Sequence, residues 1–324
     1  MQVLRWSHYW LFTLILIAIF FISACIPPSS RNSLSSPSLA TPPNCRMVRH
    51  SMGETCVPLR PQRVVTLDGV GNALALGIVP VGSWINPIIS SHLKDKVAGI
   101  AHVFSAGEPN LEKILTLKPD LILGSSYQRA IYSQLTQIAP TILAEYQTNE
   151  DWKRVLIKQA EALGKSQEAE QLMADYDTRL VQFRIQMGDK LQQIHISVVR
   201  IYPEGFALYT NDGFASTILR DAGLAYPPVH DRYQNTLIPK ERIQDIDADI
   251  ILIWSYSNSP ADEQTIQSTL KNLKNDPLWL QLHAVQQGNV YNVPSYWIGD
   301  SILEAHAIVD DLFKYLLENT ELQS

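Results

Sequence analysis

The sequence predicts an α/β fold of two similar lobes, each built on a mostly parallel sheet, with a ligand cleft between them. Two stretches share one plan, since residues 112–123 read EKILTLKPDLIL and residues 241–252 read ERIQDIDADIIL. Each stretch is typical of a short helix that opens with Glu, a tight turn at Asp and a buried strand. The length of 324 residues is enough for two ordinary α/β domains.

The composition is that of a globular protein without a nucleic-acid partner. Hydrophobic residues make up 46% of the chain and charged residues 18%. The net charge is −6 and the sequence has no long basic run. Nucleic-acid binding depends on clustered positive charge, so we expect none.

Residues 1–24 are interpreted as a lipoprotein signal peptide. Arg5 precedes an apolar run, Tyr9–Phe21, that is short for a membrane span and is soon followed by small residues. The segment Ile22-Ser23-Ala24-Cys25 resembles a bacterial lipobox, in which the cysteine is lipidated and becomes the first residue of the mature protein. An uncleaved anchor helix is the alternative. With either, the folded part lies on the periplasmic side of the cytoplasmic membrane and is tethered to it.

Residues 25–60 are predicted to hold a tether and a hairpin. Pro, Ser and Asn dominate the part up to Pro43, which has few groups to bury. Cys45 and Cys56 flank a segment with a turn signal at Gly53, which indicates a hairpin. A disulfide could close this hairpin in such a compartment, and two unpaired thiols are the alternative.

The first lobe is predicted at residues 61–147 and the second at residues 190–324. In both, short apolar runs alternate with helical segments, the pattern of a parallel sheet with covered faces. Outside the repeated stretches, the expected strands are 64–67, 80–83, 140–143, 196–201, 207–209 and 289–293. The expected helices are 73–76, 128–139, 216–222, 261–273 and 301–317.

Residues 148–189 are predicted to connect the lobes by helices. A first helix is capped by Asn149 and broken at Gly164, and a longer one runs from about Gln167 to Met187. No linker rich in Gly, Pro or Ser separates the lobes. A long rigid helix therefore joins them, and we expect small closing motions.

From about Pro61 to its end, the chain resembles the substrate-binding lipoproteins of iron–siderophore ABC importers. This group includes ferric-citrate-, ferric-hydroxamate- and cobalamin-binding proteins. The order and spacing of several short segments carry the resemblance: Pro61–Val65, Glu108–Glu112, Leu117–Ile122, Asp276–Trp279, Gly288–Tyr291, Tyr296-Trp297 and Ile308–Leu312.

The resemblance implies two Rossmann-like lobes that capture a ferric siderophore of the hydroxamate or citrate-hydroxamate type. It also implies delivery to an ABC permease with its ATPase, with no resident cofactor or metal and no catalysis, and we expect a monomer. A cobalamin, haem, zinc or manganese import protein is the alternative, and an extracytoplasmic enzyme is a further one.

The resemblance further assigns Glu112 and Glu241 to docking on arginines of the permease, one glutamate from each lobe. Their matched places in the repeated stretches favour this role. The alternative is structural, because a glutamate in the first turn of a helix complements the helix dipole.

Ligand contacts are expected just after the predicted strands, where open α/β sheets bind ligands. The candidates are Trp84, Tyr127, Arg129, Arg200, Tyr202, Trp254, Tyr256 and Trp297. The resemblance places Tyr127 and Trp297 among the aromatic contacts of ferric-hydroxamate binders. Those binders carry an Arg where this chain has Ala106-Gly107, so Arg129, Arg200 or Arg232 would supply the charge. Trp152 and Trp279 are expected to serve packing, and Tyr209 is expected to be a strand residue.

Signals for other chemistry are weak. Six histidines beyond residue 90 are scattered, whereas a zinc or manganese site needs three or four converging ligands. The sequence has no Gly-x-Ser-x-Gly, His-Glu-x-x-His or phosphate-loop motif, and Gly69-Val70-Gly71 is too short for a dinucleotide motif.

Overall fold

The computed structural model describes residues 44–85, 92–93, 95–209, 213–233, 236–257 and 260–318. They all belong to one compact unit, Pro42–Ser324. The predicted signal peptide, Cys25 and the tether up to residue 43 lie outside the described residues. In the part of the chain that is described, no helix is long and apolar enough to cross a membrane.

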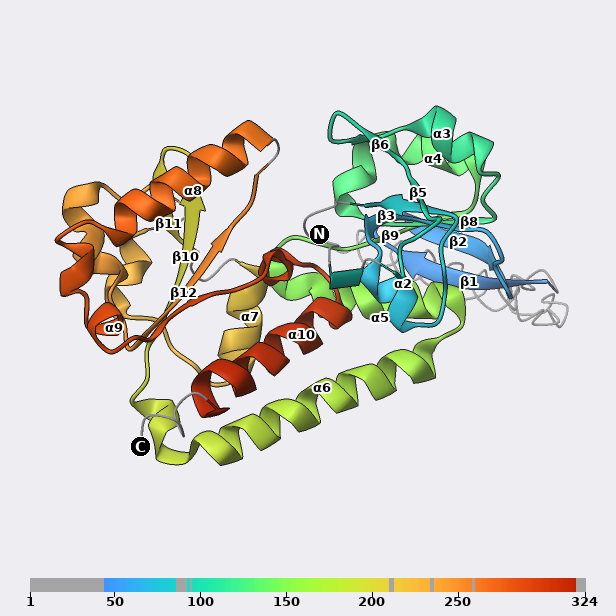
Figure 1. Cartoon of the computed structure of the whole chain (residues 1–324). Helices are drawn as coiled ribbons and strands as arrows, with labels where there is room; N and C mark the ends of the chain where they lie inside the picture. Colours follow the sequence, from blue (N-terminus) through green and yellow to red (C-terminus); the bar gives the residue numbers. More distant parts are fainter. Residues whose placement is uncertain are drawn as a thin grey trace, which may run out of the picture. The chain divides into compact units, whose positions relative to one another are not determined.

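Two larger sheets organise the fold, and both are mostly parallel, as predicted (Figure 1). The first has the order β5-β4-β3-β8-β9 and is parallel throughout. Its strands are β3 (Val64–Gly69), β4 (Gly82–Trp84), β5 (Ala101–His102), β8 (Leu121–Ser125) and β9 (Thr141–Ala144). The second has the order β11-β10-β12-β13, in which only β11 is antiparallel. Its strands are β10 (Ile196–Tyr202), β11 (Gly205–Leu208), β12 (Ile250–Ser255) and β13 (Val290–Asn292).

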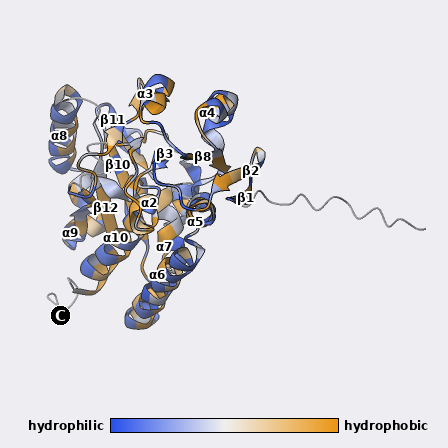
Figure 2. Ribbon diagram, turned by 90° about the vertical axis from the view of Figure 1, so that its right-hand side faces the viewer, coloured by the Kyte–Doolittle hydropathy of each residue, from blue (hydrophilic) through white to orange (hydrophobic). Residues whose placement is uncertain are grey.

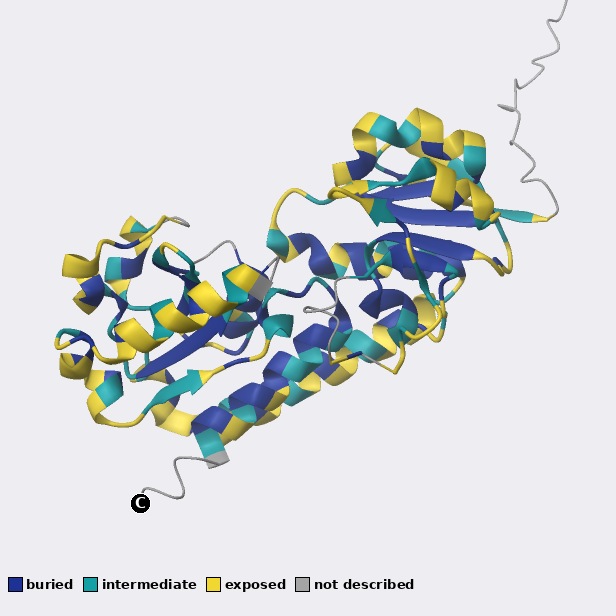
Figure 3. Cartoon of the chain, turned by 45° about the horizontal axis from the view of Figure 1, so that its top comes forward, coloured by how far each residue is buried: buried dark blue, intermediate teal, exposed yellow. Residues whose placement is uncertain are grey.

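Helices lie against these sheets because the central strands are apolar on both faces. The helices next to the first sheet are α2 (Gly71–Ala75), α3 (Leu111–Thr116) and α4 (Tyr132–Ile138). Those next to the second are α7 (Phe214–Asp221), α8 (Pro260–Lys274) and α9 (His283–Gln286). Successive residues of β8 face opposite sides of the sheet. Ile122 packs with α3 and α4, whereas Leu121 and Leu123 pack into a core that includes the connecting helices. Figure 3 shows the central strands of both sheets as buried, whereas the edge strands β5 and β13 are intermediate to exposed.

The connecting segment is helical, as predicted, and consists of α5 (Trp152–Leu163) and α6 (Ser166–Met187). Gly164 ends α5 in the left-handed conformation, with φ of 71°. Thr148, and not Asn149, caps the start of this segment. Hydrophilic and hydrophobic residues lie side by side along α6 (Figure 2), as expected of a helix with one buried face.

One hydrophobic core spans both lobes, which the sequence did not indicate. It contains Leu121 of the first sheet, Leu252 of the second, and residues of α5, α6, α7 and α10 (Ile302–Phe313). Trp152 is fully buried there, and its ring meets those of Tyr176 and Phe214 edge-on at 5.6 Å. The lobe boundaries at residues 147 and 189 stay a prediction, because the two sheets share this core.

The repeated stretches fold alike at their aspartates. The amide of Asp120 donates to the Arg63 carbonyl at 3.0 Å, and its carboxylate accepts the Arg63 amide at 2.9 Å and the Gln62 amide at 2.7 Å. Asp249 repeats this pattern with His195, donating at 3.2 Å and accepting at 2.7 Å. The helical parts differ, because the second copy forms a 3-10 helix, η6 (Lys240–Ile246), instead of an α-helix.

The predicted hairpin is formed by β1 (Cys45–His50) and β2 (Gly53–Pro58). In the structure a disulfide joins Cys45 to Cys56, with Cα atoms 5.5 Å apart. The hairpin is bonded to β9 of the first sheet and to α5 of the connecting segment. The Ser51 amide donates to the Leu143 carbonyl of β9 at 3.0 Å, and the Arg46 guanidinium donates to the Ala162 carbonyl of α5 at 3.1 Å.

We expect Asp120→Ala to lower the free energy of unfolding by about 2 kcal/mol, because two backbone amides lose a charged acceptor. Asp249→Ala removes one such acceptor contact, so we expect about 1 kcal/mol. Urea unfolding measures both values. Asp177→Ala, at an exposed position of α6, is the control and should change little. Equal stability of Asp120→Ala and the control would contradict the role of the repeated aspartate.

Candidate ligand-binding site

A pocket of about 390 Å³ lies at the carboxyl ends of β3, β4 and β8. Its lining includes Leu67 and Asp68 at the end of β3, Trp84 at the end of β4, and Ser125 at the end of β8. The remaining lining residues are Phe104, Gly107, Tyr127, Gln128, Tyr146, Val155 and Asp300. Open α/β sheets bind ligands at this edge, so the position of the pocket agrees with the sequence expectation.

Four aromatic side chains form much of the pocket wall: Trp84, Phe104, Tyr127 and Tyr146. Tyr127 is 73% exposed, which is unusual for a large aromatic residue with no covering element. Its ring lies 5.1 Å from that of Tyr146, whose hydroxyl donates to Asn149 Oδ1 at 2.6 Å. These rings offer flat apolar surfaces to an organic ligand.

Two carboxylates, Asp68 and Asp300, lie in the same pocket. Asp68 Oδ1 accepts the Ser125 hydroxyl at 2.9 Å, whereas Oδ2 is buried and has no partner among the residues described. Asp300 Oδ2 accepts the Gly69 amide at 2.9 Å. Burial raises the pKa of Asp68 to about 6. Burial, with the charges of Glu304 and Asp68, raises the pKa of Asp300 to about 7.

Asp300 reaches the pocket because the start of α10 packs closely against the end of β3 and the start of α2. Glycines at positions 69 and 71 leave room for this close approach. A Cβ atom on Gly69 would lie 1.9 Å from Asp300 Oδ1, and one on Gly71 would lie 2.0 Å from Ser301 Oγ. Asn72 Oδ1 then accepts the Ile302 amide at 3.0 Å. The Gly69–Asn72 turn therefore holds the start of α10 against the first sheet.

The second lobe contributes an arginine held on aromatic rings. The Arg200 guanidinium carbon lies 4.1 Å from the Tyr202 ring centroid and 4.7 Å from that of Trp254. The Trp254 ring meets the Tyr209 ring edge-on at 5.1 Å. No hydrogen bond or ion pair to the Arg200 guanidinium is found within the described ranges, and its Nε is buried without a partner.

Arg200 lies near the carboxyl end of β10, and the pocket lies at the carboxyl ends of β3, β4 and β8. Burial is the main cause that raises the pKa of Tyr146, and the charges of Tyr127, Asp300, Asp68 and Tyr209 add to it.

A family model described as periplasmic binding protein matches residues 65–297. The chain belongs to this family. It is 33% identical to the probable siderophore-binding lipoprotein YfiY of Bacillus subtilis, over 96% of this chain and 99% of that protein. It is 30% identical to the achromobactin-binding periplasmic protein of Dickeya dadantii, over 78% of this chain and 85% of that protein. Among solved structures it is similar to Staphylococcus aureus SirA complexed with staphyloferrin B, with a TM-score of 0.72, 28% identity, and coverage of 84% of this chain and 98% of that one.

Of the ligand-contact candidates in this periplasmic binding protein, the structure brings Trp84 and Tyr127 into the pocket and stacks Arg200 on Tyr202. Trp254 is only 2% exposed, so it supports Arg200 from beneath instead of presenting its ring to a ligand. Tyr256 is half-buried against the shared core.

Three other candidates do not line the pocket. Trp297 is fully buried, and its indole nitrogen donates to Asp311 Oδ2 at 2.7 Å, so its ring faces the core and its ligand contact stays a prediction. Arg129 is exposed and pairs with Glu145 at 3.3 Å, which neutralises its charge. Arg232 is exposed at the end of η5 (Pro228–Arg232), and no residue of this element lines the pocket.

Glu112 and Glu241 occupy matching places on the two lobes. Glu112 lies in the first turn of α3 and Glu241 in the first turn of η6, and both are exposed. Neither forms an ion pair with another residue that the structure describes. Both carboxylates are therefore available to a partner.

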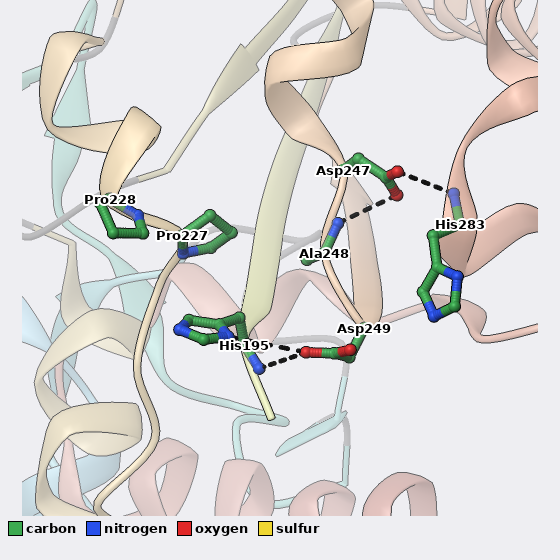
Figure 4. A pocket seen from close by; sticks show the side chains of 7 residues that line it. All are labelled: His195, Pro227, Pro228, Asp247, Ala248, Asp249 and His283. Carbon is green, nitrogen blue, oxygen red and sulfur yellow. Dashed lines mark hydrogen bonds and ion pairs between the residues drawn. The ribbon is translucent and has the colours of Figure 1, made fainter. Parts of the chain in front are cut away.

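A second pocket, of about 260 Å³, lies at the opposite end of the second sheet, where β10 and β12 begin (Figure 4). Its two aspartates already serve the fold. Asp249 accepts the His195 amide at 2.7 Å, and Asp247 accepts the amides of His283 and Ala284 at 2.8 and 3.2 Å. No group of three or more His, Cys, Asp or Glu in the described part is arranged to hold a metal ion.

Sequence reasoning missed four pocket residues: Asp68, Phe104, Tyr146 and Asp300. Asp68 ends β3 and Tyr146 follows β9, so the rule that favours residues after strands could have found both. Phe104 belongs to the short strand β6 (Phe104–Ser105), which pairs with β7 (Glu108–Pro109) and carries no periodic signal. Asp300 comes from the far end of the chain, and only the packing on Gly69 reveals it.

The raised pKa values predict how stability depends on pH. The folded protein keeps protons on Asp68 and Asp300 up to about pH 6 and 7, whereas the unfolded chain releases them near pH 4. The folded state therefore binds more protons in this window, and the free energy of unfolding falls as the pH rises through it.

We expect Asp300→Asn to raise the free energy of unfolding at pH 8 by about 1–3 kcal/mol and to change it little at pH 4. An asparagine oxygen can still accept the Gly69 amide. Urea unfolding between pH 4 and 8 measures the difference, with Asp177→Asn as the control. A variant that keeps the full wild-type decrease between these pH values would refute the assignment.

Proposed function

We propose that this periplasmic binding protein captures a ferric siderophore in the aromatic pocket and delivers it to an ABC permease. The observation that carries the proposal is an aromatic pocket at the carboxyl ends of a parallel sheet, together with an arginine near the carboxyl end of β10 that has no acid partner among the residues described. The names of the relatives support it, because YfiY is called siderophore-binding and SirA was solved with staphyloferrin B.

The pocket chemistry suits a metal that arrives already chelated. A siderophore supplies the iron ligands, so the protein contributes surfaces for the organic shell and charges for its oxygens. Trp84 and Tyr127 offer the surfaces. Arg200 offers a planar donor group for carboxylate or hydroxamate oxygens, and its stacking on Tyr202 and Trp254 holds that group in place. The ligand class is therefore a hydroxamate or citrate-hydroxamate chelate of Fe³⁺.

We also propose how the protein is anchored and in which oligomeric state it binds its ligand. Lipidation of Cys25 would anchor the chain to the outer side of the cytoplasmic membrane. We propose a monomer that needs no resident cofactor and has no catalytic activity. Cobalamin, haem and zinc or manganese remain as outcomes of the binding experiment.

Docking on the permease is proposed to use Glu112 and Glu241. The two exposed carboxylates come from different lobes, so a partner that binds both would respond to the distance between the lobes. An exposed ion pair contributes only about 0–1 kcal/mol, so these pairs would fix orientation more than affinity.

We expect ferric chelates to quench the tryptophan fluorescence of the mature chain, produced from position 25 with Cys25→Ser. The panel is ferric schizokinen, ferric aerobactin, ferrichrome, ferric citrate, haem, cobalamin and zinc. Trp84 lines the pocket, so a bound iron chelate lies near an emitting ring. A response to zinc, haem or cobalamin with none to the ferric chelates would sink the proposal.

Arg200→Ala should weaken the binding of ferric citrate and ferric aerobactin by about 10- to 100-fold, because a charged hydrogen bond is worth about 1.5–3 kcal/mol. Titration by fluorescence measures the change. Arg49→Ala is the matched control, since Arg49 is exposed and its side chain pairs with Glu54 on the hairpin. Equal affinities of the two variants would remove Arg200 from the site.

The double variant Glu112→Ala/Glu241→Ala should bind the ferric chelate normally and lose uptake of ⁵⁵Fe in cells that depend on this protein. Removing both carboxylates takes away the proposed contacts with the permease and leaves the pocket intact. Glu170→Ala/Glu204→Ala changes two other exposed glutamates and is the control. Full uptake by the first double variant would exclude the docking role.

A further inference from the structure

We propose that the pocket of the first lobe is an ammonium-binding subsite, which selects ferric siderophores that carry a protonated amine. The inference rests on the proposed function and specifies the ligand further. Aromatic rings and carboxylates surround one cavity of about 390 Å³, and this combination of groups recognises organic cations.

Above about pH 7, where both aspartates are ionised, the charges of the pocket are of one sign. Asp68 and Asp300 line it, and none of the described residues that line it is Lys, Arg or His. His92 pairs with Glu304 at 3.1 Å and does not line the pocket. An anionic chelate group would meet repulsion in this pocket, whereas a cation would be attracted.

The two carboxylates have acceptor atoms to spare. Asp68 Oδ2 is buried without a partner, although its other oxygen accepts the Ser125 hydroxyl. Asp300 uses Oδ2 for the Gly69 amide, and no hydrogen bond to its Oδ1 occurs among the residues described. A buried carboxylate oxygen without a donor is costly, and an incoming N–H group would satisfy it.

The aromatic rings that line the pocket would also attract a cation. Tyr127 and Tyr146 lie with their centroids 5.1 Å apart, and Trp84 and Phe104 line the same cavity. A cation over such ring faces is attracted by their quadrupoles, most strongly when water is displaced. These rings alone would suit any organic shell, but their position around two carboxylates favours a cationic one.

The second lobe carries a positive charge, that of Arg200. Arg200 has no acid partner within the described part of the chain, and its two aromatic neighbours hold its guanidinium in place. The site is therefore polarised, with anion recognition on the second lobe and cation recognition on the first. A ligand with its oxygens at one end and an amine at the other matches this arrangement.

The test compares two chelates that differ by one charge: ferrioxamine B, which ends in an ammonium group, and its N-acetylated form, which is neutral there. The mature chain with Cys25→Ser should bind ferrioxamine B at least about tenfold more tightly, as expected for one charged hydrogen bond with an aromatic contribution. Ferric citrate serves as an anionic chelate without an amine.

The variants Asp68→Asn and Asp300→Asn keep the size of the side chains and remove the charge. Each should reduce the preference for ferrioxamine B, because the ammonium then loses one of its two ionic partners. Asp177→Asn is the control and should keep the preference. Urea unfolding verifies that each variant is folded, and either aspartate variant alone suffices for the comparison.

Equal affinities of the wild type for the two ferrioxamines would overturn the inference. An undiminished preference for ferrioxamine B in both aspartate variants would overturn it as well. Binding of ferric citrate without measurable binding of ferrioxamine B would overturn it too, because the pocket would then reject the cation. These outcomes leave the proposed function intact. No binding of any ferric chelate would instead overturn the proposed function, and the subsite with it.

Discussion

The fold depends on one interaction that occurs once in each sheet, between an aspartate and the residue that precedes the neighbouring strand. Asp120 exchanges backbone and side-chain hydrogen bonds with Arg63, and Asp249 does so with His195. The next residues are paired in the sheets, Leu121 with Val64 and Ile250 with Ile196. Each aspartate thus fixes the register of a central strand pair, and with it the level at which Asp68 and Arg200 end their strands.

The sequence predicted what local patterns can encode. Apolar runs and turns located the sheets, and the repeat located Glu112 and Glu241. It could not predict the direction of a side chain where a distant partner decides it. Trp297 follows the last strand, as a ligand contact would, but a hydrogen bond to Asp311 on α10 turns its ring inward. Asp300 had no local signal at all, because its place depends on glycine in a turn at the other end of the sequence.

The shared core limits how independently the two lobes can move. Leu121 and Leu252 belong to different sheets, yet both pack into the cluster around Trp152 and α10. The start of α10 is also bonded to the first sheet through Gly69 and Asn72. Opening the site widely would break these contacts. The prediction of small closing motions therefore has a second cause besides the rigid helix α6.

The disulfide hairpin has a mechanical consequence. It is the first element that the structure describes, and it is bonded to β9 through Ser51 and to α5 through Arg46. A pull on the chain before Cys45 would pass across the disulfide to Cys56 and be shared by these attachments. The load would therefore enter the fold both at β9, the outer edge strand of the first sheet, and at a helix of the connecting segment.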